Sequence, residues 1–256
     1  MLELKQIESF YPEPMRVFKR NLLREYLQYK ILDIIFNTEF SNKLVFMGGT
    51  ANRIVHGNNR FSEDLDFDNF NLNNSEFKNL TEIISKKLSL EGYEVETRNI
   101  FKGAFHCYIG FRNLLYETKL SGHKKEKLMI RLDTEAQGIE YDPDKIILNK
   151  FDVFTRINVV PRPMLLAQKI LAILYRKRSM GRDFYDTIFL LSNTRPDFDY
   201  LKIKADIKTI DELKSRLGQK CQVLNFKQLA KDVEPFLINH EDTKRVLLFY
   251  DYIKNL

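Results

Sequence analysis

Apolar positions follow two different spacings along this chain, and the change from one to the other falls near residue 160. Up to that point, short apolar or alternating runs between polar turns predict strands. We expect strands at 44–47, 64–67, 93–97, 104–111 and 128–133, and further apolar segments at 145–151 and 153–160. Helical spacing in the same part of the chain predicts helices at 14–40 and 76–90.

The segment Pro161-Arg162-Pro163 interrupts both patterns, because two prolines in three residues break a regular element. Beyond it the apolar spacing is helical almost to the end, with helices expected at 164–178, 183–192, 209–217, 226–236 and 241–255. The pattern therefore predicts an α+β domain over residues 1–160, followed by a helical domain over residues 161–256.

Composition adds limits on location and partners. The 256 residues are 44% hydrophobic and 12% aromatic, which is typical of a globular protein. No apolar run approaches the roughly 20 residues of a membrane span, and the N-terminal residues do not resemble a secretory signal. Cys107 and Cys221 are widely separated and match no metal or redox spacing. We therefore expect a cytoplasmic protein with reduced thiols and no membrane partner, whose net charge of +6 is compatible with a polyanionic partner.

A glycine turn, Gly48-Gly49-Thr50, follows the first apolar strand and precedes a short helix that we expect to end at Gly57. Glycines at such a turn let the backbone approach a ligand closely. The amide groups, the Thr50 hydroxyl and the helix N-terminus would form a positive concavity suited to phosphate. A turn without any ligand is the alternative interpretation.

The next strand carries Asp64 and Asp66, which project from one face because side chains alternate along a strand. Neighbouring carboxylates repel each other, and a hard divalent cation relieves that repulsion. A solvated strand end is the alternative. A calcium loop beginning at Asp64 and continuing through Asp68 is excluded, because Asn69 and Ser75 stand where that loop requires Gly and Glu.

Asp133 ends a strand whose apolar residues point the other way, so it could supply a third metal ligand and accept the proton of an attacking hydroxyl. A solvated edge or an ion pair with Arg131 is the alternative. Lys169 emerges from an apolar helix, either as a snorkelling lysine or as a triphosphate clamp. Arg176 shares its face, and with Arg182 it belongs to the densest basic cluster, which is either a solvated helix end or a polyanion site.

The helix that follows opens with Asp183 and Asp186. Both residues fit a structural interpretation, with Asp183 as an N-cap and Asp186 as a first-turn acid. The competing hypothesis is that one of these acids faces a nucleotide.

The first of two motif blocks consists of Met47–Ala51 and Gly57–Phe67, and the second of Lys169–Ile173 with Arg176, Arg182–Asp186 and Phe189–Leu191. Together these blocks resemble the nucleotidyltransferases of the AbiEii/AbiGii toxin family, within the DNA polymerase β-like superfamily. The resemblance implies a polymerase β-like core, a mixed sheet flanked by helices, followed by a C-terminal helical bundle, with the active site between them. Asn52 departs from the family pattern, which usually has a bulky apolar residue there.

The resemblance also implies roles for particular residues. Gly48, Gly49 and Thr50 would hold the triphosphate of an NTP, and Asp64 and Asp66 would bind Mg²⁺, with Mn²⁺ as the alternative ion. Lys169 and Asp183 match the essential residues of the second block, while Arg176, Arg182 and Asp186 would assist nucleotide binding. Members of the family are commonly toxins of toxin–antitoxin or abortive-infection systems, and some modify the 3′ end of tRNA, so RNA and a cognate antitoxin are the expected partners.

The leading hypothesis is therefore a Mg²⁺-dependent enzyme that transfers NMP from an NTP to a hydroxyl on RNA. An enzyme of the same fold acting on a small, antibiotic-type molecule is one alternative, against which the basic cluster weighs. A catalytically silent nucleic-acid or partner-binding module is the other, and the joint presence of Asp64, Asp66 and Lys169 argues against it.

Overall fold

The computed structural model describes residues 2–256, which form two compact units. Unit 1 runs to His56 and resumes from Phe61 to Val160, whereas unit 2 comprises Gly57–Arg60 and Pro161–Leu256. The four residues Gly57–Arg60 thus belong to unit 2, and the chain returns to unit 1 at Phe61, just before the strand that carries Asp66. No single cut in the sequence reproduces this division.

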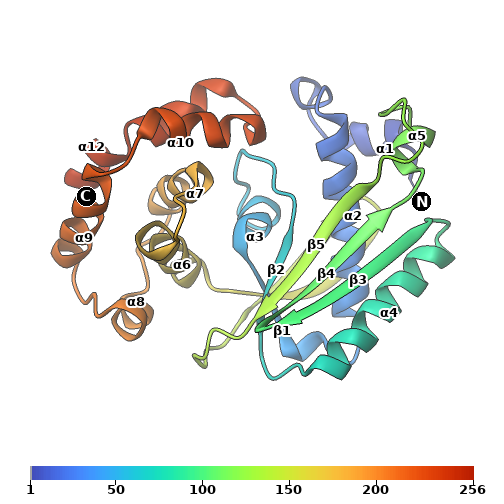
Figure 1. Ribbon diagram of the computed structural model, residues 1–256, viewed down its shortest axis with the longest axis horizontal. Helices are drawn as coiled ribbons and strands as arrows, with labels where there is room; N and C mark the ends of the chain where they lie inside the picture. The colour runs from blue at the N-terminus through green and yellow to red at the C-terminus, as the bar shows by residue number, and fades with distance from the viewer. Residues whose placement is uncertain (1) are drawn as a thin grey trace. The chain divides into compact units, whose positions relative to one another are not determined.

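Unit 1 combines a sheet with helices (Figure 1). Its helices are α1 (Leu4–Ser9), α2 (Lys19–Phe36), α3 (Gly48–Ile54), α4 (Asn74–Leu90) and α5 (Leu114–Glu117). Its strands are β1 (Leu44–Met47), β2 (Leu65–Asn69), β3 (Val95–Lys102), β4 (Ala104–Phe111), β5 (Leu128–Glu135), β6 (Asp144–Lys150) and β7 (Val153–Val159).

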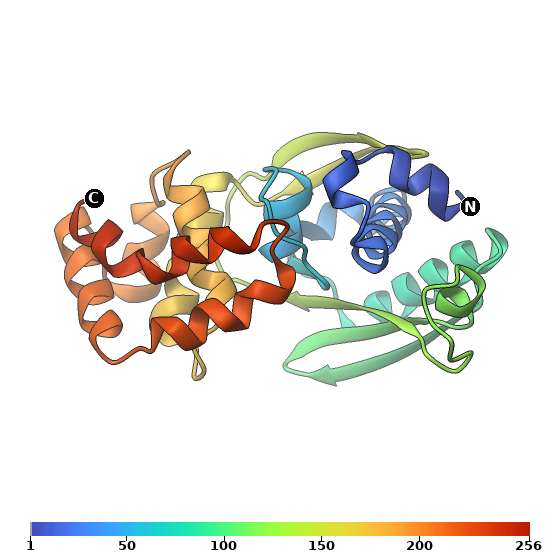
Figure 2. The same ribbon diagram turned by 90° about the horizontal axis from the view of Figure 1, so that it is seen from above.

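The seven strands form one sheet in the order β3-β4-β5-β2-β1-β7-β6. Strand β2 pairs in parallel with β5, and β1 pairs in parallel with β7, while the other neighbours are antiparallel. Seen from above, the twisted sheet curls around α2 (Figure 2). The predicted mixed sheet flanked by helices is therefore confirmed.

The face of the sheet that packs on α2 is apolar. Phe67 of β2 contacts Phe46 of β1 and Phe36 of α2, with ring centroids 5.5 and 6.3 Å apart. On β5 the alternation is equally regular, since Ile130 and Leu132 are both fully buried. The intervening polar residues must then lie on the opposite face of the sheet.

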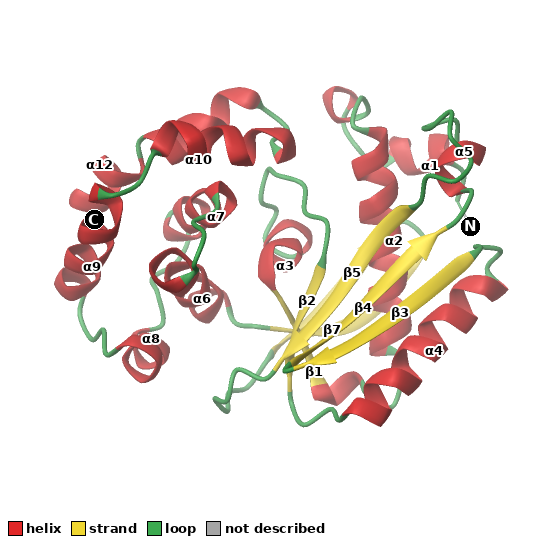
Figure 3. Cartoon of the chain, in the orientation of Figure 1, coloured by secondary structure: helices red, strands yellow, loops and turns green. Residues whose placement is uncertain are grey.

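Unit 2 is built from helices, as predicted (Figure 3). They are α6 (Arg162–Tyr175), α7 (Gly181–Leu191), α8 (Phe198–Ala205), α9 (Ile210–Gln222), α10 (Phe226–Val233), α11 (Lys244–Leu247) and α12 (Phe249–Lys254). Phe184 of α7 packs against Phe226 and Phe249 in the core of the unit. Helix α8 was not predicted, and the single helix expected at 241–255 is divided into short elements. Throughout residues 2–256, no helix is both long and apolar enough to cross a membrane.

Candidate active site

The acidic residues predicted to act together occupy one face of the sheet in unit 1. Asp66 on β2 lies directly beside Asp133 in the parallel register with β5. Leu65 and Phe67 are fully buried on the helix-covered face, so Asp66 projects from the other face. Asp64 immediately precedes β2 and shares the side-chain parity of Asp66.

Gly48 allows the turn after β1 to approach this face closely. Met47 is the register partner of Asp66, and Gly48, at φ +80°, follows it. Any Cβ at this position would collide with the Asp66 carboxylate, and the positive φ is itself unfavourable for other residues. Gly48 and Gly49 open α3 directly after β1, which places their amides next to the acidic strand.

Two buried polar side chains hold the backbone that leads into the acidic strand. The Thr50 hydroxyl donates a hydrogen bond to the carbonyl oxygen of Asp64. The Gln28 amide, on α2, donates to the carbonyl oxygens of Ser62 and Glu63 at 3.0 and 3.1 Å. Thr50 therefore anchors Asp64, which differs from the phosphate contact expected of its hydroxyl. Gln28 was missed by the sequence analysis, because α2 carries many polar residues and nothing in its sequence sets Gln28 apart from them.

A guanidinium group balances the acidic face. Arg131 Nη2 donates to Asp64 Oδ2 at 2.9 Å, and Arg131 Nε lies 2.9 Å from Asp133 Oδ2 in an ion pair. His106 Nδ1 lies 2.7 Å from the other oxygen of Asp133. Partial burial lowers the pKa of Arg131, but the two carboxylates outweigh it and hold that pKa above its ordinary value. The ion pair between Asp133 and Arg131, left open as an alternative by the sequence, is thus present.

The chemistry of this face fits a divalent cation such as Mg²⁺, because its three carboxylates supply hard oxygen ligands. The Arg131 guanidinium already occupies the position of a cation between Asp64 and Asp133. Among residues 2–256, no three His, Cys, Asp or Glu side chains are gathered as a ready metal site. The carboxylates are therefore suitable ligands for a divalent cation, but Asp64 and Asp133 are arranged here around the Arg131 guanidinium.

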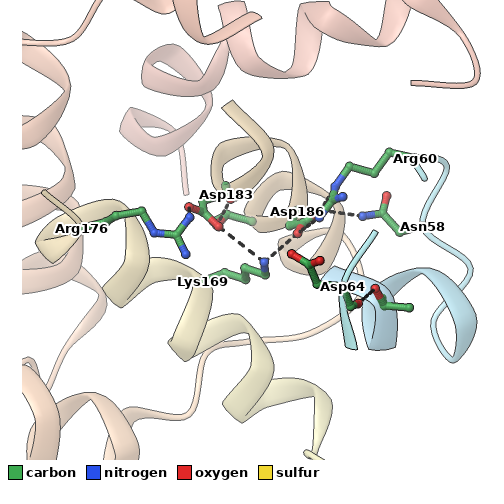
Figure 4. Close-up of polar contacts among 9 residues, drawn as sticks. Asn58, Arg60, Asp64, Lys169, Arg176, Asp183 and Asp186 are labelled. Carbon is green, nitrogen blue, oxygen red and sulfur yellow. Dashed lines mark hydrogen bonds and ion pairs between the residues drawn. The ribbon is translucent and has the colours of Figure 1, made fainter. Parts of the chain in front are cut away.

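The second group of predicted residues lies in unit 2, where α6 meets α7. Lys169 Nζ lies 2.9 Å from Asp186 Oδ2 and 3.4 Å from Asp183 Oδ1 (Figure 4). Arg176, which caps α6, approaches Asp183 Oδ2 with its Nη1 at 2.7 Å. The Lys169 side chain is only 11% exposed, so it pairs with acids inside the unit instead of snorkelling to water.

Asp186 is fully enclosed. Arg60 Nε and Nη2 donate to its two oxygens at 2.6 and 2.5 Å, and Asn58 Nδ2 donates at 2.8 Å. Burial alone would raise the pKa of Asp186, but the Arg60 and Lys169 cations lower it to about 2. This environment favours a role in holding the segment Gly57–Arg60 over the nucleotide contact first assigned to Asp186.

Asp183 does not cap its helix. The N-cap of α7 is Met180, and Asp183 lies in the first turn with its carboxylate between Lys169 and Arg176. Its side chain is nearly fully buried, whereas the neighbouring Arg182 is partly exposed. The N-cap interpretation of Asp183 is therefore wrong.

Arg60 and Asn58, which hold Asp186 in place, are residues that the sequence analysis did not single out. Both lie within the first block of the family resemblance, and that position was the available signal.

Comparisons with known proteins agree with this architecture. The model of the family described as nucleotidyl transferase AbiEii toxin, type IV TA system, matches residues 30–245. The fold is similar to the crystal structure of JHP933 from Helicobacter pylori, with a TM-score of 0.54 and 18% identity over 92% of each chain. A candidate nucleotidyltransferase from H. pylori gives the same TM-score and identity, over 92% of this chain and 95% of that one. No curated protein sequence matches this chain.

Proposed function

The chain belongs to the AbiEii nucleotidyl transferase toxin family of type IV toxin–antitoxin systems, and from that premise we propose that it transfers NMP from an NTP to a hydroxyl on RNA. In this proposal Asp64, Asp66 and Asp133 bind Mg²⁺ or, alternatively, Mn²⁺. The reaction takes place in the cytoplasm, where its substrates are, and a cognate antitoxin protein restrains it.

The observation that carries the proposal is the register of β2 against β5. It sets Asp66 beside Asp133 on the face of the sheet away from α2, with Asp64 two residues from Asp66. The close approach of Gly48 to Asp66 brings backbone amides to the same place. Acidic oxygens beside donor amides are the combination that a metal-bound triphosphate requires.

The transfer itself makes one bond and breaks one bond. The acceptor oxygen bonds to the α-phosphorus of the NTP, the bond from that phosphorus to the bridging oxygen breaks, and pyrophosphate leaves. Asp133 takes the proton of the acceptor hydroxyl on a carboxylate oxygen. When bound, the divalent ion neutralises charge on the phosphates. Most of the acceleration would come from positioning.

In unit 2 we assign the triphosphate contacts to the cations. Lys169, Arg176 and Arg182 supply positive charge, and two of them share Asp183 as a partner. Asp183 would then position Lys169 and Arg176 without touching the nucleotide.

The deciding experiment incubates the purified protein with total RNA, Mg²⁺ and each of the four α-labelled NTPs in turn. We expect label to enter RNA with at least one nucleotide. The matched control is Asp66→Asn, which keeps side-chain shape and should transfer no label. Absence of label in RNA with every NTP, while a panel of small hydroxyl compounds is labelled, would favour the antibiotic-type alternative. Absence of label in both would favour the silent binding module.

A further inference from the structure

Arg131 is placed where it must compete with any metal ion for the acidic face. Its guanidinium lies between Asp64 and Asp133, each of which is a proposed ligand, at 2.9 Å from both. It comes from β5 itself, two residues before Asp133 on the same face, so its backbone is fixed relative to the acids. A divalent ion bound by both carboxylates would require the oxygens that Arg131 now holds.

The side chain of Arg131 is also free to move away from the two carboxylates. It is 37% exposed, so it is not enclosed by the fold as Arg60 is. Tyr108 on β4 is its direct register partner and offers a ring face and a hydroxyl on the same side of the sheet. A second guanidinium, that of Arg98, already lies 5.1 Å from the centre of the Tyr108 ring. A cation already occupies that ring, so it is the partial exposure of Arg131 that lets its guanidinium turn to solvent when it leaves the acids.

We propose that Arg131 is a tethered counter-cation, which holds Asp64 and Asp133 in the absence of metal and which a divalent ion must displace. This inference rests on the proposed metal-binding role of these acids. It assigns to Arg131 the setting of metal affinity: each ion pair that must be broken subtracts from the free energy of metal binding. Arg131 thereby competes with the metal ion for the oxygens of Asp64 and Asp133, and it contacts neither substrate in the proposal.

The test measures metal binding alone, without nucleotide or RNA. Wild-type protein and Arg131→Gln are titrated with Mn²⁺ by calorimetry at constant ionic strength. Two partly exposed ion pairs are worth up to a few-fold each, so Arg131→Gln should bind Mn²⁺ about tenfold more tightly. Arg131→Lys, which keeps a charge but not the planar fork, should lie between the two.

The matched control is Arg112→Gln. Arg112 lies just beyond the C-terminal end of β4, and the substitution removes the same charge from an exposed ion pair with Glu96. It should leave the Mn²⁺ affinity within about twofold of wild type, because screening limits long-range effects. A second readout is thermal: without metal, Arg131→Gln should unfold at a lower temperature than wild type, and saturating Mn²⁺ should raise its Tm by more.

The outcomes separate this inference from the function on which it rests. Equal affinity in wild type and Arg131→Gln would overturn the inference while leaving the metal site intact. Weaker binding by Arg131→Gln would also overturn it, and would mean that Arg131 organises the ligands. Absence of Mn²⁺ binding in all variants would overturn both the inference and the proposed metal role. Should Arg131→Gln fail to fold, the comparison of Arg131→Lys with wild type decides in the same way.

Discussion

Replacing Asp186 by Asn tests whether this acid serves the fold of unit 2. The carboxylate is fully buried and accepts two hydrogen bonds from Arg60, whose side chain is 1% exposed. The difference between its ordinary pKa of 3.8 and about 2 corresponds to about 2 kcal/mol in favour of the ionised folded form. Asn also leaves the Arg60 charge uncompensated, and breaking a buried pair costs roughly 3–5 kcal/mol.

We therefore expect Asp186→Asn to lower the free energy of unfolding by about 3 kcal/mol. In a protein of this size that corresponds to a Tm decrease of roughly 6–12 °C. Urea denaturation at pH 7 followed by circular dichroism gives the value directly. The control is Asp211→Asn, an exposed first-turn acid of α9, which should change stability by less than about 1 kcal/mol.

A second comparison isolates the pair itself. The double variant Arg60→Met with Asp186→Leu removes both charges, so it should be more stable than Asp186→Asn alone. The pH dependence has a defined sign, because the folded-state pKa of Asp186 lies below the unfolded one. The stabilisation is complete above about pH 4 and is lost as the pH falls toward about 2. A wild-type denaturation midpoint for Asp186→Asn, or a double variant less stable than the single one, would refute this reasoning.

Three further changes test other parts of the structure. Asp66→Asn should reduce nucleotidyl transfer at least about a thousandfold. Its Tm should stay equal to wild type or rise slightly, because repulsion between Asp66 and Asp133 is relieved. Near-normal turnover would contradict the metal assignment. Gln28→Ala should cost about 1–3 kcal/mol and lower kcat, because two partly buried carbonyl groups lose their donor; unchanged kcat in the folded protein would remove its positioning role. Asn52→Leu should raise Tm by a few degrees, because both polar atoms of Asn52 are buried without a partner among residues 2–256; a lower Tm would contradict this expectation.

The acidic face was predictable because strand alternation is a local property. Leu65 and Phe67 mark one face of β2, so the face of Asp66 follows without any tertiary information. The parallel partner of β2 was not predictable in this way. The register between Asp66 and Asp133 depends on a long crossover; strand alternation nominated Asp133 as a third acid, but only the structure shows that it lies beside Asp66.

Partners remote in sequence account for what the local pattern missed. Asp183 and Asp186 are three residues apart in one helix and look equivalent in the sequence. What distinguishes them is Arg60, which is 126 residues from Asp186 and encloses it. The hydroxyl of Thr50 presents the same difficulty, since its acceptor is the backbone of Asp64, and backbone acceptors leave no mark in a sequence.

This distinction changes how the first block of the family resemblance should be interpreted. The string from Gly57 to Phe67 contains two physically different segments, because Gly57–Arg60 belongs to unit 2 and the residues from Phe61 onward belong to unit 1. Asn58 and Arg60 bind Asp186, whereas Asp64 and Asp66 lie on the face of the sheet away from α2. Loss of activity on substitution therefore has two causes within one motif. A residue can be assigned to the chemistry only when stability is measured beside activity. By that criterion, substitution of Arg60 should lower both stability and activity, whereas substitution of Asp66 should lower activity alone.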